Sequence, residues 1–161
     1  MKIGVVSDTH GNTQAVERVV AMLPDAALWL HAGDYISDGE YLELLADTGV
    51  VKVAGNGDWP HASEPYEKVV EAAGHKIFLT HGHTHGVNYG TDILLKDAAA
   101  ADCDIAIYGH THRVDVREGK ITIINPGSAS RPRDEHRPSF IIMELTEGQK
   151  PAIEVIRLED E

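Results

Sequence analysis

Short apolar runs, each followed at once by a cluster of aspartate, asparagine, histidine and glycine, are the feature that most constrains the fold of this chain. The clusters are Asp8-Thr9-His10, Gly33-Asp34, Gly55-Asn56-Gly57-Asp58, His81-Gly82-His83 and Gly109-His110-Thr111-His112. Each apolar run has the length and composition of one buried strand, and α/β proteins bind ligands where strands end. The five clusters are therefore expected to converge on one place.

The spacing of apolar and turn residues predicts strands and helices along the whole chain. Strands are expected at Lys2–Ser7, Ala27–His31, Val50–Ala54, Tyr66–Ala72, His75–Thr80, Asp104–Tyr108, Val114–Arg117, Lys120–Ile124, Ser139–Leu145 and Ala152–Leu158. Helices are expected at Thr13–Leu23, from Ser37 or Asp38 to about Ala46, and from Tyr89 or Thr91 to Ala101. The alternation gives way to a strand-rich second half, which predicts an α/β (α+β) fold with two sheets face to face and helices outside.

The composition limits the chain to one domain, 1–161, and narrows its partners. Its 161 residues are 42% hydrophobic and 25% charged, which is enough for one core. The net charge of −12 argues against general binding to a nucleic-acid backbone. A small phosphorylated substrate stays compatible with this charge, because bound metal ions reverse the local field.

The single cysteine and the lengths of the apolar runs favour a reducing, cytoplasmic location. Cys103 is alone, so no intrachain disulfide forms. No apolar run approaches the ~20 residues of a membrane span, and the apolar start Met1–Val6 is too short for a signal-peptide core. We therefore expect no membrane contact, while the oligomeric state stays open, a homo-oligomer included.

The side chains of the five clusters are of types that bind divalent metals. Asp8 and His10 stand two residues apart, as do His110 and His112, so each pair points one way in an extended chain. Carboxylate and amide oxygens with imidazole nitrogens suit manganese, iron, zinc, cobalt or nickel rather than calcium. Two metals about 3.5–4 Å apart need a bridging carboxylate, for which Asp34 is the candidate. Flanking glycines would let these ligands turn toward a shared centre.

Together the clusters resemble the calcineurin-like metallophosphoesterase superfamily. The motifs are Asp8-x-His10, Gly33-Asp34, Gly55-Asn56-x-Asp58, His81-Gly82 and Gly109-His110-x-His112, and the resemblance covers roughly Lys2 to Leu158. The short chain and Asn125-Pro126-Gly127-Ser128 look most like the compact bacterial and archaeal phosphodiesterase branch, which is related to vacuolar sorting protein 29. The resemblance implies a β-sandwich flanked by helices, in four αββα layers.

The resemblance also implies ligand roles and a reaction. Asp8, His10 and His112 would hold one metal, Asn56, His81 and His110 the second, and Asp34 would bridge both. A hydroxide between the metals would attack the phosphorus of a phosphate ester, with a diester favoured over a monoester. Manganese is the expected metal, with nickel, zinc, iron or cobalt as alternatives.

One departure from the superfamily concerns the general acid. Many members carry a histidine directly after the metal-binding asparagine, which is thought to bind phosphate and protonate the leaving group, whereas this chain has Gly57. His83 is the nearest chemical substitute; alternatively, a good leaving group needs no acid. Asn56 and Asp58 complete the predicted catalytic set, with Asp58 orienting a ligand rather than binding metal.

The remaining basic and histidine residues receive weaker assignments. Arg131 and Arg133, ahead of Arg137, are predicted to bind phosphate oxygens, with a solvated loop as the alternative. Among the other histidines, the prediction places His31 behind the ligands or in the core, His85 in a loop or at the substrate rim, and His61, His75 and His136 at the surface.

Two other functions compete with a phosphoesterase that acts on small substrates. The first is a non-catalytic interaction scaffold of the same fold, which the complete set of seven ligand positions disfavours. The second is a nuclease, which the acidic charge and the lack of a long basic groove disfavour.

Overall fold

The computed structural model describes residues 1–134 and 136–159. Its helices are α1 (Thr13–Met22), α2 (Ile36–Leu45) and α3 (Asp92–Ala100), and its 3₁₀ turns are η1 (Asn56–Asp58), η2 (His83–His85) and η3 (Val87–Tyr89). Its strands are β1 (Lys2–Val6), β2 (Leu28–His31), β3 (Gly49–Lys52), β4 (Glu67–Ala72), β5 (His75–Thr80), β6 (Ile105–Ile107), β7 (Val114–Arg117), β8 (Thr122–Pro126), β9 (Ser139–Glu144) and β10 (Ala152–Arg157).

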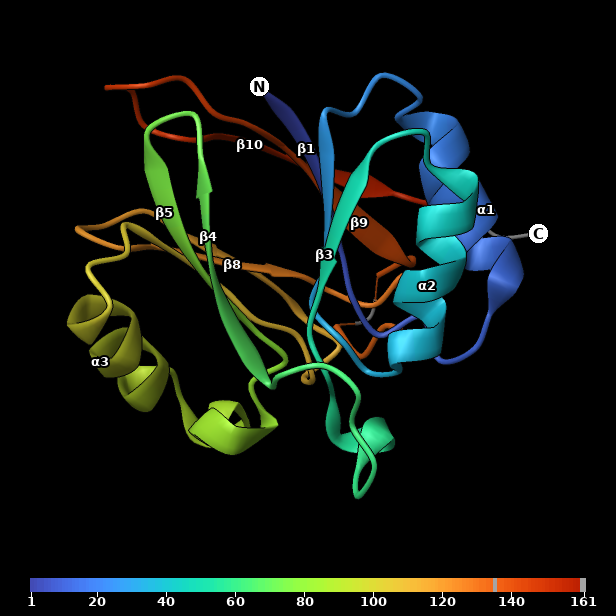
Figure 1. The fold of residues 1–161 in the computed structure, drawn as a ribbon, viewed down its shortest axis with the longest axis horizontal. Coiled ribbons are helices and arrows are strands. Elements are labelled where there is room, and N and C mark those ends of the chain that lie inside the picture. The colour runs from blue at the N-terminus through green and yellow to red at the C-terminus, as the bar shows by residue number, and fades with distance from the viewer. Residues whose placement is uncertain (135, 160–161) are drawn as a thin grey trace.

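Two five-stranded sheets pack face to face, in the orders β10-β9-β1-β2-β3 and β4-β5-β6-β8-β7. Helices α1 and α2 cover the outer face of the first sheet, and α3 covers that of the second (Figure 1). The predicted two-sheet αββα fold is confirmed.

Parallel pairing determines where the polar clusters meet. Strands β1, β2 and β3 are parallel in one sheet, and β5, β6 and β8 are parallel in the other. The turns η1 and η2, which follow β3 and β5, both lie at the lower edge of the sandwich in Figure 1. Five loops that follow parallel strands therefore reach one edge of the molecule.

The core between the sheets is aliphatic. Its completely buried side chains include Ile3, Leu30, Ile77 and Ile107. Branched aliphatic side chains pack well between the facing surfaces of two sheets. A second, outer core contains Trp29, whose ring packs against Phe140 beneath α1 and α2.

Local capping explains where α1 begins. The side chain of Asn12 accepts a hydrogen bond from Ala15 N at 3.1 Å, and the helical spacing of Ala15, Val16 and Val19 buries one face. The helix ends at Met22, one residue before the predicted Leu23, and Pro24 follows.

Helix α2 begins earlier than the prediction of Ser37 or Asp38. Its cap residue, Tyr35, supplies no side-chain hydrogen bond. Instead, the carboxylate of Asp58, in another loop, accepts a hydrogen bond from Ile36 N, with Oδ1 at 3.0 Å. This tertiary cap leaves no local signal in the sequence.

The hairpin partner of β7 lies two residues further along than the predicted Lys120–Ile124. Strand β8 spans Thr122–Pro126 because Val114 pairs with Pro126 and Arg117 with Ile123, which leaves a longer loop around Glu118-Gly119. Asn125 and Pro126, which lie beyond the end of the predicted strand, are buried in β8.

The prediction that His75 lies at the surface is wrong. The side chain is buried at the start of β5, where Asp104 and the carbonyl of Thr146 hold its two ring nitrogens. The prediction used the general tendency of histidine to be exposed, which does not apply to a ring whose two nitrogens both have hydrogen-bond partners. The surface prediction holds for His61 and His136, which are exposed. Within the described residues, no helix has the length and hydropathy of a membrane span.

Candidate metal centre

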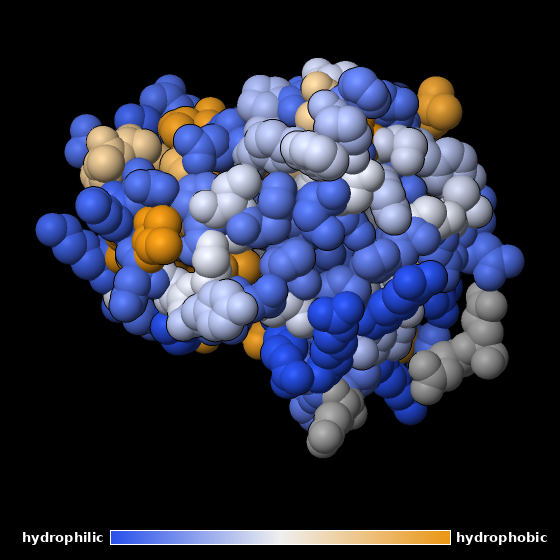
Figure 2. Space-filling view, turned by 90° about the horizontal axis from the view of Figure 1, so that it is seen from below, coloured by the Kyte–Doolittle hydropathy of each residue, from blue (hydrophilic) through white to orange (hydrophobic). Residues whose placement is uncertain are grey.

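The structure brings the seven predicted metal ligands together at the lower edge of the sandwich. They come from loops of both sheets and form a continuous chain of contacts, which we call the central cluster: Asp8, His10, Asp34, Asn56, His81, His110 and His112. Seen from this side, the molecule presents a mostly hydrophilic surface (Figure 2).

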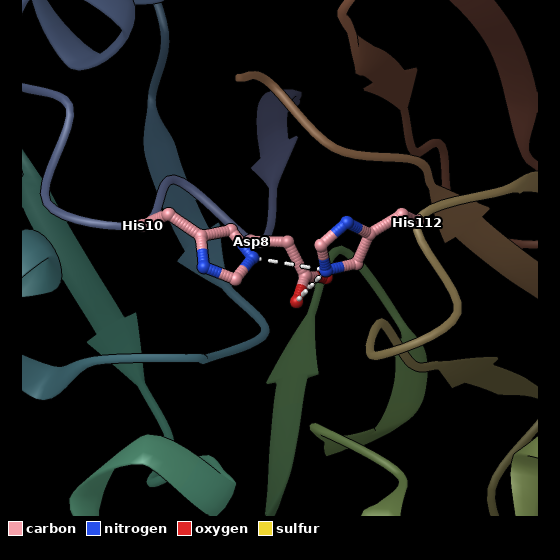
Figure 3. A group of neighbouring side chains, drawn as sticks. All are labelled: Asp8, His10 and His112. Carbon is pink, nitrogen blue, oxygen red and sulfur yellow. Dashed lines mark hydrogen bonds and ion pairs between the residues drawn. The ribbon is translucent and has the colours of Figure 1, made fainter. Parts of the chain in front are cut away.

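Three of the seven side chains form the first half of the cluster. Figure 3 shows His10 and His112 approaching each other on either side of Asp8. The Nε2 atoms of the two histidines are 2.9 Å apart, and His112 Nε2 is 3.3 Å from Asp8 Oδ1. The ligand atoms of these three residues all lie within 4.8 Å of one another, which is close enough to share one metal ion.

Asp34 connects this half to the other. Its Oδ2 lies 3.2 Å from His10 Nδ1, and its Oδ1 lies 4.0 Å from His81 Nε2. The same His81 nitrogen is 3.0 Å from Asn56 Oδ1 and 3.2 Å from His110 Nδ1. The carboxylate of Asp34 thus stands between the two groups of ligands.

Backbone carbonyls orient two of the imidazole rings. His81 Nδ1 is 2.7 Å from the carbonyl of Ala32, and His112 Nδ1 is 2.7 Å from that of Arg131. A carbonyl only accepts hydrogen bonds, so both Nδ1 atoms carry hydrogen and both Nε2 atoms face the cluster. This arrangement is typical of metal-binding histidines.

The cluster is built on strained backbone. Asp8, His10, His110 and His112 have φ of 55°, 49°, 70° and 60°, and they are four of the six positive-φ residues other than glycine in the described chain. Such conformations cost about 1–3 kcal/mol each and concentrate at functional sites. The sequence led us to expect that neighbouring glycines would make these turns, but the ligands themselves make four of them.

Close packing is what Gly109 provides. A Cβ there would lie 2.1 Å from Ser7 Oγ, so a side chain would push apart the loops that carry Asp8 and His110. Gly33 has both roles, with φ of 89° and a position where a Cβ would lie 2.8 Å from the His81 ring.

Charges within the cluster shift the acidities of its members. Burial would raise the pKa of Asp8, but contacts with His112 and His81 outweigh it and lower that pKa. Burial would likewise lower the pKa of His112, yet Asp8 raises it above its ordinary value. Burial lowers the pKa of His10 and of His110, so their rings are neutral at neutral pH, as metal binding requires.

The donor set fits a divalent metal. Asp8 Oδ1 is fully buried and has no hydrogen-bond partner, an arrangement that is costly for a carboxylate oxygen without a cation. Imidazole nitrogens face each other in the His10–His112 and His81–His110 pairs, as they do when they share a cation. Oxygen and imidazole ligands without thiolate suit first-row transition metals.

His83, the predicted general acid, lies beside the cluster. Its ring centroid is 5.5 Å from that of His81 and 6.2 Å from that of His110, and Tyr66 packs edge-on against it. Burial, together with the neighbouring imidazoles, lowers the pKa of His83 to about 4. The ring is therefore neutral at neutral pH, and its Nδ1 is buried without a hydrogen-bond partner.

A tyrosine ring occupies the space next to Gly57, where many superfamily members carry a histidine. A Cβ on Gly57 would lie 2.4 Å from the ring of Tyr35. The same ring lies edge-on to His10, with centroids 6.2 Å apart. Glycine at 57 and tyrosine at 35 are thus sterically linked.

Asn56 and Asp58, predicted as catalytic, contribute differently. Asn56 Oδ1 faces His81. Asp58 accepts hydrogen bonds from the backbone N–H groups of Gly55 and Ile36, so it fastens the Asn56 loop to the start of α2. Its carboxylate thus orients a ligand loop.

The arginine loop packs against His112. His112 Nδ1 donates to Arg131 O, and Arg133 N donates to His112 O at 2.9 Å. The side chains of Arg131 and Arg133 are exposed and form no ion pair with the described residues 1–134 and 136–159. The loop therefore lies beside the cluster, with both arginine side chains in solvent.

Ser7 and Asn88 are hydrogen-bonding residues of the site that the sequence did not predict. Ser7 Oγ donates to Asp8 Oδ2 at 2.7 Å and also lies 3.0 Å from Gly33 O, so it ties two ligand loops together. Asn88 Nδ2 lies 3.2 Å from His110 Nε2. Ser7 follows an apolar run directly before Asp8, which is a usable signal, whereas Asn88 reaches the site only through the η3 turn.

Two further predictions about supporting residues can be compared with the structure. His31 is completely buried behind the cluster, where its Nδ1 accepts from Gly33 N and its Nε2 faces Thr9 Oγ1, as expected. Burial lowers the pKa of His31 to about 4. His85 lies in the η2 turn of the loop after β5, which agrees with the loop prediction, but it is not at a substrate rim, because its side chain is buried and contacts Glu67 and Asp97.

The fold and the ligand set define a metallophosphoesterase. Residues 1–148 match the calcineurin-like phosphoesterase superfamily domain, and the chain belongs to this superfamily. A probable metallophosphoesterase from Methanothermobacter thermautotrophicus is 34% identical over 98% of this chain and 92% of its own. Phosphodiesterase YfcE from Escherichia coli is 29% identical, over 100% of this chain and 94% of its own.

A solved structure agrees with these sequence relatives. It is a Streptococcus pneumoniae protein described as a predicted phosphoesterase, and it is 30% identical with a TM-score of 0.83. The alignment covers 97% of this chain and 88% of that one. The resemblance expected from the sequence motifs is confirmed.

Proposed function

We propose that this chain is a metal-dependent phosphodiesterase that acts on small phosphorylated substrates with two divalent cations in the central cluster. The observation that carries the proposal is the position of Asp34, whose two carboxylate oxygens face the two halves of the ligand set. Manganese is the first candidate, with nickel, zinc, iron and cobalt as alternatives. The preference for diesters is supported by the similarity to phosphodiesterase YfcE.

The chain's own residues would position substrate and proton. Two cations at this site would supply Lewis acidity and lower the pKa of water toward neutrality. Arg131 and Arg133 would bind phosphate oxygens beside the cluster. His83 would offer a hydrogen bond to the leaving oxygen, but a neutral imidazole is a weak acid, so esters with good leaving groups should react best.

The competing proposal, a scaffold without catalysis, has less support. All seven ligand positions hold competent side chains, and the structure brings them together. Four of them also have strained φ values, which are typical of functional sites. We also propose a cytoplasmic location, supported by the single cysteine.

The test is a substrate screen of the full chain, stripped of metal and reloaded with each candidate cation. Chromogenic phosphodiesters and monoesters are compared, and Asp34→Asn is the control. We expect metal-dependent turnover that is highest for an aryl diester and absent in the control. Wild-type protein that binds metal but hydrolyses neither class would overturn the proposal in favour of the scaffold.

A further inference from the structure

A second histidine–carboxylate group lies on the outer side of the second sheet. Glu67 at the start of β4, His85 in η2 and Asp97 in α3 form this group, which we call the peripheral triad. His85 Nε2 is 3.1 Å from Glu67 Oε2 and 3.1 Å from Asp97 Oδ2. The imidazole side chain is only 4% exposed, whereas the two carboxylates are 54% and 45% exposed.

Hydrogen bonding alone leaves the charge of this triad unbalanced. Nε2 carries at most one hydrogen, so it serves two carboxylates at the same distance with one donor. Within residues 1–134 and 136–159, neither Glu67 nor Asp97 forms an ion pair with lysine or arginine, and the nearby Lys68 is 2.7 Å from Glu64. A protonated His85 would still leave one negative charge, which a divalent cation would offset.

The distances suit a tetrahedral metal site. When metal–ligand bonds are about 2.0–2.1 Å, tetrahedral ligand atoms stand about 3.3 Å apart. The three ligand atoms of the triad lie within 4.8 Å of one another, and the two nitrogen–oxygen separations are 3.1 Å. Glu67 and Asp97 also line an open hollow of about 440 Å³, together with Lys68 and Phe78, so solvent reaches both carboxylates.

Neighbouring residues hold the ring in a metal-binding orientation. Thr84 Oγ1 lies 3.1 Å from His85 Nδ1, where it accepts the Nδ1 hydrogen when Nε2 binds a metal. The ring of Phe78 packs edge-on against His85, with centroids 5.6 Å apart. The buried ring is thereby fixed while its Nε2 faces the carboxylates.

We propose that Glu67, His85 and Asp97 bind one divalent transition-metal cation of the zinc class, separate from the central cluster. A bound ion would fasten three elements together: β4, the turn after β5 and helix α3. That turn begins two residues after His81 and includes His83, so the ion would also steady one side of the central cluster. The inference does not depend on catalysis.

The test is a zinc titration of the metal-free full chain by equilibrium dialysis and calorimetry. We compare the wild type with Asp97→Asn, His85→Gln and Glu67→Gln, and the matched control is Glu71→Gln, an exposed carboxylate on the same strand. We expect one zinc equivalent to be lost or weakened at least ~10-fold in each triad variant, since even residues behind metal ligands are worth 10–100-fold. Glu71→Gln should bind zinc like the wild type.

Two further measurements make the result decisive. The titration is repeated in the Asp34→Asn background, where the triad's equivalent should persist, so this outcome is independent of the proposed phosphoesterase activity. Zinc should also raise the thermal midpoint of the wild type more than that of Asp97→Asn, whose half-exposed side chain makes misfolding a poor explanation. If Asp97→Asn binds as much zinc as the wild type, with the same affinity, the proposal is overturned.

Discussion

Histidines contact carboxylates at both ends of the β-sandwich, but the two ends differ in whether the protein supplies hydrogen-bond partners for these groups. At the end where the parallel strands finish, Asp8 Oδ1 is buried without a hydrogen-bond partner, and the Nε2 atoms of His10 and His112 face each other at 2.9 Å. These groups are complete only when a cation joins them. Strained backbone holds them there.

At the opposite end, His75 is completely satisfied by the protein. Its Nδ1 is 2.6 Å from Asp104 Oδ2, and its Nε2 is 3.0 Å from the carbonyl of Thr146. A buried histidine–carboxylate contact therefore does not by itself indicate a metal site. What distinguishes the central cluster is polar atoms that the protein leaves without partners.

The largest expected difference between the two ends is in the loss of kcat/KM when one carboxylate is replaced at each end. Asp34→Asn is expected to lower kcat/KM at least ~100-fold, because the amide weakens ligation on both sides. Asp104→Asn, at the other end, should change kcat/KM by no more than about twofold, because it touches no ligand. Steady-state kinetics with elemental analysis measures both, and equal losses would contradict the comparison.

That the seven side chains of the central cluster lie together was predictable, because each belongs to a motif that is local in the sequence. Asp8, Asp34 and His81 lie within three residues of the end of a strand, and parallel strands carry such positions to one edge. The two-sheet fold followed from the same alternation. Spacing alone did not divide these side chains between two metals, and the predicted division depends on the resemblance to the superfamily motifs.

Long-range contacts explain what the sequence did not reveal. The cap of α2 comes from Asp58, 22 residues away, and the partners of His75 include a carbonyl 71 residues away. The burial of His85 was not predicted for the same reason, because Glu67 and Asp97 contact it from other elements. Polar groups satisfied at such separations leave no local periodicity.

The second prediction concerns the proton donor at the cluster end. His83→Ala should slow alkyl esters about 10–100-fold and aryl esters much less, because only a poor leaving group needs the hydrogen bond. His61→Ala, an exposed histidine, is the control. Rates are measured on matched aryl and alkyl diesters. Wild-type rates on both classes in His83→Ala would show that His83 does not assist the leaving group.

The third prediction concerns the arginine loop beside His112. Arg131→Ala and Arg133→Ala should each weaken substrate binding by about 1.5–3 kcal/mol, seen as a higher KM, because charge-assisted hydrogen bonds are lost. Any contribution to encounter should fade as salt rises. Arg137→Ala, further along the loop, should change KM less. An unchanged KM in all three variants at low and high salt would leave the loop as solvated surface.

The smallest expected effect lies at the opposite end and involves stability rather than activity. Burial lowers the pKa of His75, but the contacts with Asp104 and Thr146 outweigh it, so the pKa is raised in the folded protein. A raised folded-state pKa means that the folded chain binds the proton more tightly than the unfolded chain. This contribution is therefore fully present below the unfolded pKa of about 6.5 and is lost as pH rises through the folded pKa.

His75→Asn separates this titration from the rest of the contact. Asparagine keeps a donor that can face Asp104 but carries no titratable proton, and the loss of the second hydrogen bond should cost about 0.5–1.5 kcal/mol at any pH. The extra advantage of the wild type should be largest below about pH 6.5 and shrink as the pH rises. Denaturant unfolding at a series of pH values measures this difference in free energy. If the difference in free energy of unfolding between the wild type and His75→Asn instead grew with pH, His75 would be neutral in the folded protein. The proposed ion pair between His75 and Asp104 would then be wrong.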